Sequence, residues 1–229
     1  MLLSDYDRVV CITTDIRYYE HASRIKSLLL EHGVNLNRIS FFVNGKGTLL
    51  PEQFYQQILL DSDVPKDFTY NYGYYAVSRA FQSVIQSALE SGANSLLVLE
   101  DDCLFVPDFD AVLNEANSQL ESLPPWDLLY YGANHTQAQV KELSSNVLRC
   151  KTSFMTHCIG IHQSIMQRLV ELPITASFDI MLAHGIQHSC RCYAIWPSIA
   201  IQLPGYSCID GCYKDLTEVF QSKGDLWKD

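Results

Sequence analysis

The first half of the chain alternates between short apolar runs and longer amphipathic segments. Val9–Thr14 and Ile39–Val43 are mainly apolar runs of strand length, and the residues between them place apolar side chains at helical spacing up to Gly33. Apolar runs of this length are typical of strands that are buried on both faces of a parallel sheet. A strand, a helix and a second strand in this order favour parallel strands joined by a right-handed crossover. The pattern predicts an α/β fold.

The most distinctive pattern is an apolar run, Leu96–Leu99, that continues directly into Glu100, Asp101 and Asp102, just after a predicted amphipathic helix over 71–90. Three adjacent carboxylates at the end of a buried strand repel one another unless a cation neutralises them. Clustered hard oxygen ligands suit Mg²⁺ or Mn²⁺, and ligands of open α/β sheets bind beyond the carboxyl ends of the strands. We therefore expect a site for a metal and a phosphorylated ligand; the alternative is a solvated turn after the strand.

The second half predicts further elements around this site. Pro107 is expected at the first position of a helix, a polar insertion over 133–145 is typical of an active-site loop, and the residues after 207 are expected to form a covering tail. A short helix is expected from Ser177, with Asp179 in its first turn. Strands are expected over 126–132, 147–150, 154–161 and 191–197, the middle two as a hairpin or sheet edge.

Charge and composition exclude several classes of protein. The net charge is −10 and the acids are spread along the chain, so nucleic-acid binding through a basic face is not expected. No segment reaches the ~20 apolar residues of a membrane span. The N-terminus has neither a basic leader nor a long apolar stretch, so we expect no secretory signal. The 8 cysteines are interpreted as mostly reduced thiols of a cytoplasmic protein. The oligomeric state is not predicted.

Four polar residues are candidates for contacts with a nucleotide. Thr13, Thr14 and Asp15 end the first predicted strand, where such a fold places its ligand; the alternative is that they cap the following helix. Arg79, in the helix over 71–90, is a candidate for a phosphate contact. The alternative for Arg79 is a packed helix start with tyrosines at its rim.

A structural zinc site is a second metal hypothesis. It would draw on histidines and cysteines that lie close together in the late part of the chain: His184, His188, Cys190, Cys192, Cys208 and Cys212. None of their spacings matches an established zinc finger, and buried thiols are the commoner outcome.

The order of these motifs resembles a known family. A helix leads into Leu97–Asp102, another helix and Trp126–Gly132 follow, Thr156–Ile161 forms a further strand, and Asp179 precedes a late strand. This order is similar to the glycosyltransferases that build bacterial lipopolysaccharide, to collagen galactosyltransferases and to related small viral glycosyltransferases. The resemblance covers roughly 9–207 and is specific around the acidic strand and the Trp126 strand. It implies the A-type glycosyltransferase fold, a Rossmann-like sheet with an acidic metal motif.

The resemblance also implies roles for individual residues. Asp102 would be the principal ligand of Mn²⁺ or Mg²⁺, and Glu100 would contact the ribose or the metal through water. Asp101 points opposite to its neighbours along an extended backbone and is expected to matter least of the three, although it remains a candidate contact to the nucleotide sugar. A late histidine completes the metal shell in many such enzymes, which makes His188 or His157 a candidate. The serine–histidine pair of the family appears here as Ser78-Arg79, so the role of that histidine is in doubt.

The expected single domain follows from the length of the chain and from the lack of a dividing linker, and its expected fold follows from the same resemblance. We expect one Rossmann-like α/β domain over 1–229 with a mixed, mostly parallel central sheet flanked by helices. Its nucleotide-binding part would be about 1–132 and its acceptor-side part about 133–229. No internal repeat or linker divides the chain.

Glycosyl transfer also needs a base that deprotonates the attacking hydroxyl, and Asp179 is the candidate. The alternative for Asp179 is an acid favoured by the helix dipole. The resemblance implies an inverting glycosyltransferase of polysaccharide biosynthesis that moves a sugar from a nucleotide sugar, UDP-linked by default, to a glycan or other hydroxyl acceptor. Two alternatives stay open: a metal-dependent nucleotidyltransferase or phosphohydrolase, and a non-catalytic module that binds a nucleotide or sugar.

Overall fold

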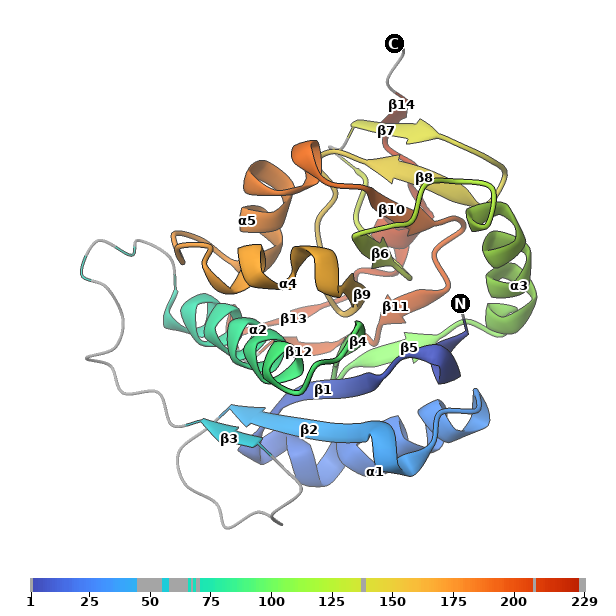
Figure 1. Ribbon diagram of the computed structural model, residues 1–229. Helices are drawn as coiled ribbons and strands as arrows, with labels where there is room; N and C mark the ends of the chain where they lie inside the picture. The colour runs from blue at the N-terminus through green and yellow to red at the C-terminus, as the bar shows by residue number, and fades with distance from the viewer. Residues whose placement is uncertain are drawn as a thin grey trace.

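The apolar runs of the sequence pair into one large mixed sheet, as a computed structural model of the protein shows for residues 2–44, 55–57, 66, 68, 71–136, 139–207 and 209–226 (Figure 1). The sheet has ten strands in the order β14-β7-β8-β10-β6-β9-β4-β1-β2-β3. They are β1 (Arg8–Thr14), β2 (Ile39–Asn44), β3 (Tyr55–Gln57), β4 (Ser95–Glu100), β6 (Leu128–Tyr130), β7 (Gln139–Glu142), β8 (Val147–Cys150), β9 (Cys158–His162), β10 (Cys192–Ile195) and β14 (Asp225–Leu226).

Helices and two small sheets complete the structure. The α-helices are α1 (Asp15–Glu31), α2 (Tyr72–Glu90), α3 (Phe109–Leu120), α4 (Gln163–Val170) and α5 (Phe178–Gly185). The 3₁₀ helices are η1 (Leu3–Asp5), η2 (Leu36–Arg38), η4 (Gln187–Ser189) and η5 (Thr217–Gln221). The small sheets pair β5 (Cys103–Phe105) with β11 (Ala200–Gln202), and β12 (Gly205–Ser207) with β13 (Cys212–Lys214).

Strand direction confirms the expected fold class. Strands β3, β2, β1 and β4 are parallel neighbours, as predicted for the opening strand–helix–strand unit. Among the described strands of the large sheet, β9 and β8 run against their neighbours, and the other strands share one direction. The protein is therefore a Rossmann-like α/β fold with a mixed, mostly parallel sheet flanked by helices.

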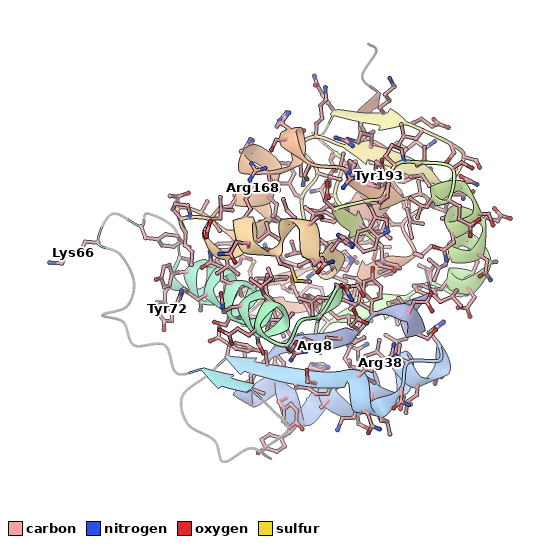
Figure 2. All side chains as sticks on the ribbon, in the orientation of Figure 1. Arg8, Arg38, Lys66, Tyr72, Arg168 and Tyr193 are labelled. Atoms are coloured by element: carbon pink, nitrogen blue, oxygen red, sulfur yellow. The ribbon has the colours of Figure 1, made fainter. Side chains whose placement is uncertain are left out.

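Helices cover both faces of the sheet, and each layer has its own core. Helices α2, α4 and α5 pack on one face through residues such as Phe81 and Phe178, whose rings stack with centroids 4.5 Å apart. Helices α1 and α3 pack on the other face through residues such as Ile25 and Phe109. Burial of both faces explains why the strands read as continuous apolar runs. By contrast, the exposed Arg38 and Arg168 lie at the periphery (Figure 2).

Three expectations about the second half are wrong. Helix α3 begins at Phe109 with Asp108 as its N-cap, so Pro107 precedes the helix. The segment over 133–145 contains β7, whose buried Val140 packs into the core, and none of its described residues lines the cleft described below.

The third concerns strand pairing. Strands β8 and β9 form no hairpin, because β9 lies in the sheet between β4 and β6. The residues after 207, expected as a covering tail, include β13, η5 and β14.

No helix in the described part of the chain is long and apolar enough to cross a membrane.

Candidate functional site

A cleft of about 780 Å³ opens at the carboxyl ends of β1 and β4. Because these strands are parallel neighbours, their ends meet at one edge of the sheet, which is where open α/β sheets bind ligands. The N-terminal ends of α1, α2 and α5, the connection between β8 and β9, and the hairpin β12–β13 form its walls. The cleft therefore collects side chains from segments far apart in the sequence.

Glu100 ends β4 and faces this cleft. Its N–H donates to the carbonyl of His157 at 2.9 Å, and its Oε1 accepts a hydrogen bond from Thr156 Oγ1 at 3.2 Å. Burial, and then the neighbouring charge of Asp102, raises the pKa of Glu100 to about 8. A carboxyl group in this state binds a proton at neutral pH, or a cation that takes the proton's place.

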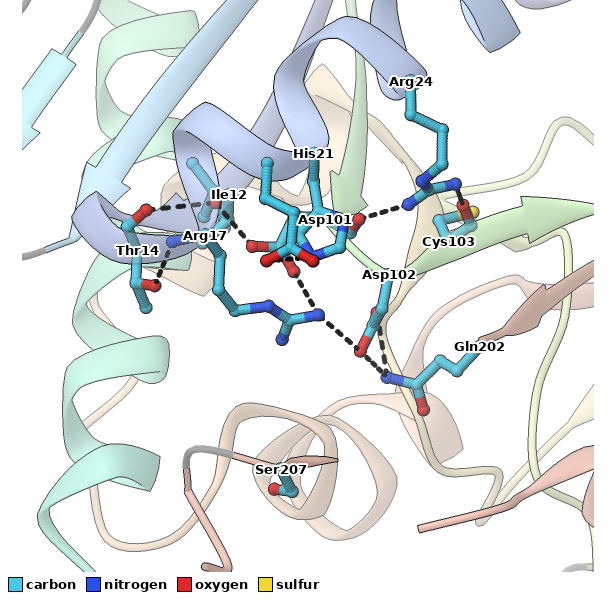
Figure 3. A network of polar contacts seen from close by, with 12 residues as sticks. Ile12, Thr14, Arg17, His21, Arg24, Asp101, Asp102, Cys103, Gln202 and Ser207 are labelled. Carbon is cyan, nitrogen blue, oxygen red and sulfur yellow. Dashed lines mark hydrogen bonds and ion pairs between the residues drawn. The ribbon is translucent and has the colours of Figure 1, made fainter. Parts of the chain in front are cut away.

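Asp101 is the buried member of the acidic run. Its Oδ2 accepts a hydrogen bond from Thr13 Oγ1 at 2.5 Å, and its Oδ1 lies 3.1 Å from Arg17 Nη2 (Figure 3). Burial raises the pKa of Asp101, and Arg17 and Thr13 partly offset that rise. Arg24 donates to the carbonyls of Asp101 and Cys103, so the acidic turn is fastened to α1 through side chain and main chain alike.

Asp102 is the more open of the two aspartates, with 21% of its side chain exposed against 7% for Asp101. Its Oδ2 lies 3.9 Å from Arg17 Nη2. Gln202 Nε2 lies 3.3 Å and 3.4 Å from the two carboxylate oxygens. These long contacts leave Asp102 well placed to accept a further ligand from the cleft.

Asp179 lies at the start of α5 on another wall of the cleft. Ser177 Oγ and the N–H of Ile180 donate to its Oδ1 at 2.6 Å and 2.9 Å, and the N–H of Met155 donates to its Oδ2 at 3.2 Å. The contacts hold the carboxylate in one orientation. Asp179 thus has both a position in a helix first turn and access to the cleft.

The hairpin β12–β13 forms the outer rim and is tied to α2. Asn71 Nδ2 donates to the carbonyl of Ile209 at 2.7 Å, and Tyr74 Oη donates to Asp210 Oδ1 at 2.5 Å. Lys214 pairs with Asp210 Oδ2 at 2.6 Å. Burial and the hydrogen bond to Asp210 raise the pKa of Tyr74 to about 12, so its hydroxyl keeps the donated proton.

The structure brings most of the predicted site residues together. The cleft is lined by Thr13, Thr14, Glu100, Asp101, Asp102 and Asp179. Thr14 also caps α1, its side chain accepting from the N–H of Arg17 at 3.3 Å, which is the alternative expected for it. Asp15 begins α1, and its side chain lies outside the described residues.

Three other candidates lie away from the cleft. Arg79 is half-buried on α2, and His188 is exposed in η4; neither is among the lining residues. His157 is fully buried, its Nε2 lies 3.0 Å from the carbonyl of Ala200, and burial lowers its pKa.

Several lining residues escaped prediction. They are Arg17, His21, Thr156, Gln202 and Lys214. Arg17 had one usable signal, since it lies three residues after the helix cap Thr14 and therefore in the first turn of a helix that starts at the ligand edge. Gln202 and Lys214 had none, because strand pairing and a hairpin late in the chain bring them to the site.

The donor set at the end of β4 suits a hard divalent cation. Mg²⁺ usually takes one or two protein carboxylates and completes its shell with phosphate oxygens and water. Glu100 and Asp102 would supply two such carboxylates. Among the residues that the structure describes, no group of three or more His, Cys, Asp or Glu side chains is arranged to hold a metal. A cation held by Glu100 and Asp102 would thus need further ligands, such as phosphate oxygens and water.

The zinc hypothesis gains no such support within the described residues. His184 and His188 are exposed, whereas Cys190 and Cys192 are buried. Cys208 lies outside the described residues.

Comparisons with known proteins concern the fold only. No protein-family model matches the sequence, and no curated protein matches it. Similar solved structures include A197 from STIV (10% identity, 82% of this chain and 81% of that chain, TM-score 0.42). Others are mannose-1-phosphate geranyltransferase from Thermus thermophilus (9%, 82% and 73%, TM-score 0.44) and the inositol-1-phosphate CTP transferase from T. maritima (12%, 83% and 85%, TM-score 0.45). At these identities and TM-scores they carry nothing about activity.

Proposed function

We propose that the protein is a metal-dependent, inverting glycosyltransferase of A-type fold that transfers a sugar from a nucleotide sugar to a hydroxyl acceptor. One observation carries the proposal: Glu100 and Asp102 at the end of β4 share a single cleft with Asp179 at the start of α5. This arrangement supports the proposal, because the proposed cation ligands and the candidate base line one space large enough for a nucleotide sugar.

Each carboxylate has a distinct task in this proposal. Asp102 and Glu100 would hold Mn²⁺ or Mg²⁺, and the bound cation would neutralise the departing diphosphate as a Lewis acid. Asp179 accepts the proton of the acceptor hydroxyl while that oxygen bonds to the anomeric carbon and the bond from this carbon to the diphosphate breaks. Attack from the side opposite the leaving group inverts the anomeric configuration.

The nucleotide of the donor and the acceptor are proposed by chemical class only. UDP is the default nucleotide and a glycan hydroxyl the default acceptor, in keeping with a role in polysaccharide biosynthesis.

The described cysteines are free thiols, most of them buried, which is the state expected in a reducing cytoplasm.

Nucleotidyl transfer is the second candidate, and Arg17 favours it. A guanidinium beside a carboxylate pair at a phosphate site is suited to phosphoryl chemistry, where Arg stabilises the transferring group. The products separate the two candidates: glycosyl transfer releases a nucleoside diphosphate, and nucleotidyl transfer from a nucleoside triphosphate releases pyrophosphate.

A thermal-shift screen of nucleotide sugars with and without Mn²⁺ tests the proposal. We expect a UDP- or GDP-sugar to raise the melting temperature only when Mn²⁺ is present. The variant Asp102→Asn should lose this metal-dependent shift, whereas Asp108→Asn, which alters an N-cap residue outside the cleft, should keep it. An unchanged shift in Asp102→Asn would rule out the acidic strand as the site.

A further inference from the structure

Arg17 occupies the space between the two aspartates of the acidic run. Its Nη2 is 3.1 Å from Asp101 Oδ1 and 3.9 Å from Asp102 Oδ2, and Figure 3 shows the guanidinium reaching from α1 toward both. The side chain is 23% exposed, so part of it faces the cleft that it lines. One protein cation thus neutralises carboxylates that would also attract a bound metal ion.

A metal ion and Arg17 are competitors for Asp102. Two positive charges near one carboxylate oxygen repel each other, and in a partly buried site this repulsion is worth more than in water. The link from Arg17 to Asp101 is shorter and more buried than its link to Asp102. A cation that takes Asp102 therefore displaces the guanidinium from the weaker of its two contacts.

The surroundings offer the displaced guanidinium an anionic partner. Arg17 lies in the first turn of the 17-residue helix α1, where the helix dipole favours an anion. Phosphate oxygens accept two parallel hydrogen bonds from a guanidinium. A diphosphate at this helix end would lie within reach of Arg17 and of the cation on Asp102 together.

We propose that Arg17 changes partners during donor binding: it neutralises the aspartates while the cleft is empty and binds the diphosphate once a divalent cation holds Asp102. The inference rests on the proposed function, and it makes Arg17 a binding residue with two opposite effects. Arg17 weakens the binding of the bare cation and strengthens the binding of the cation together with a nucleoside diphosphate.

Isothermal titration of the whole chain with Mn²⁺ alone, and then with UDP at saturating Mn²⁺, tests this directly. In Arg17→Gln we expect Mn²⁺ alone to bind about fivefold more tightly, and UDP with Mn²⁺ to bind about 30-fold more weakly. Arg17→Lys keeps the charge but not the planar fork. Its affinity for Mn²⁺ alone should stay near that of the wild type, while its affinity for UDP falls.

Arg38→Gln is the control. Arg38 also donates to main-chain carbonyls, those of Ser4 and Tyr6, but it is not among the residues that line the cleft. Both affinities of this variant should stay within about twofold of the wild type. Melting curves of the three variants check that each is folded, and Arg17→Lys carries the test if Arg17→Gln does not fold.

The outcomes separate this inference from the proposed function. If the wild type shows no metal-dependent binding of UDP or a UDP-sugar, the proposed function fails. If the wild type binds but Arg17→Gln weakens both affinities together, or leaves both unchanged, Arg17 is a structural ion pair and the exchange of partners is wrong.

Discussion

The carboxylate of Asp179 accepts a hydrogen bond from the N–H of Met155 at 3.2 Å, and Met155 is the one non-glycine residue with a positive φ, 76°, in the part of the chain that the structure describes. The next residue, Thr156, donates to Glu100. Two consecutive residues thus connect the candidate base to the candidate metal ligand. Left-handed backbone at a non-glycine residue costs free energy and is often found at functional sites, so this turn is a sensitive part of the cleft.

The strain at Met155 predicts an unusual order of stability for two variants of this residue. Met155→Ala and Met155→Gly both remove the side chain, but glycine adopts a positive φ without steric cost. We expect Met155→Gly to be more stable than Met155→Ala by about 1 kcal/mol. Urea unfolding of both variants measures the difference. The usual order, with alanine the more stable, would show that the turn is not strained.

Asp179→Asn should separate donor binding from transfer. The amide keeps the size of the side chain but accepts no proton, so we expect the affinity for the donor to persist while the transfer rate falls by at least about 100-fold. Binding is measured by titration and transfer by release of the nucleoside diphosphate. Ser177→Ala removes one hydrogen bond to Asp179 and should cost far less activity. Loss of donor binding in Asp179→Asn would reject its assignment as the base.

The raised pKa of Glu100 predicts a pH-dependent cost to stability. The folded-state pKa, about 8, exceeds the ordinary value of 4.5. Protonation of Glu100 therefore favours the folded state, and this contribution, complete below pH 4.5, is lost as the pH rises through about 8. In the absence of metal we expect Glu100→Gln to melt about 5 °C above the wild type at pH 9, with the gap closing toward pH 5.

Exposed Glu90 provides the control for that measurement. Glu90→Gln should leave the pH dependence of the melting temperature close to that of the wild type. An equal gap between Glu100→Gln and the wild type at all pH values would contradict a raised pKa at Glu100.

His135 predicts that stability falls at acidic pH, a dependence opposite in direction to that predicted from Glu100. It is buried, its Nδ1 lies 2.8 Å from Ser153 Oγ, and burial lowers its pKa from 6.5 to about 4. Protonation then favours the unfolded state, so this contribution is complete above pH 6.5 and is lost as the pH falls toward 4. We expect His135→Gln to flatten the fall in unfolding free energy over this range, by up to about 1.4 kcal/mol per pH unit. Exposed His184→Gln should not flatten it.

Local pattern was sufficient for the first strands of the sheet and for part of the candidate site. The strands β1, β2 and β4 follow from continuous apolar runs, because both faces of the sheet are covered. The ligand edge follows from their parallel order, since parallel strands end together and acids at that edge are exposed to a common cleft. These rules pointed to Thr13, Glu100 and Asp102, and the family resemblance pointed to Asp179; all four residues line the cleft.

Only tertiary structure decided what surrounds those residues. The position of β9 between β4 and β6 brings Thr156 beside Glu100, and the pairing of β11 with β5 brings Gln202 beside Asp102. Neither pairing leaves a signal in the local sequence, because long-range strand order depends on which apolar faces pack together and not on the spacing of residues along the chain. For the same reason the chain alone indicated three acids that needed a cation, and the fold revealed that Arg17 already lies between two of them.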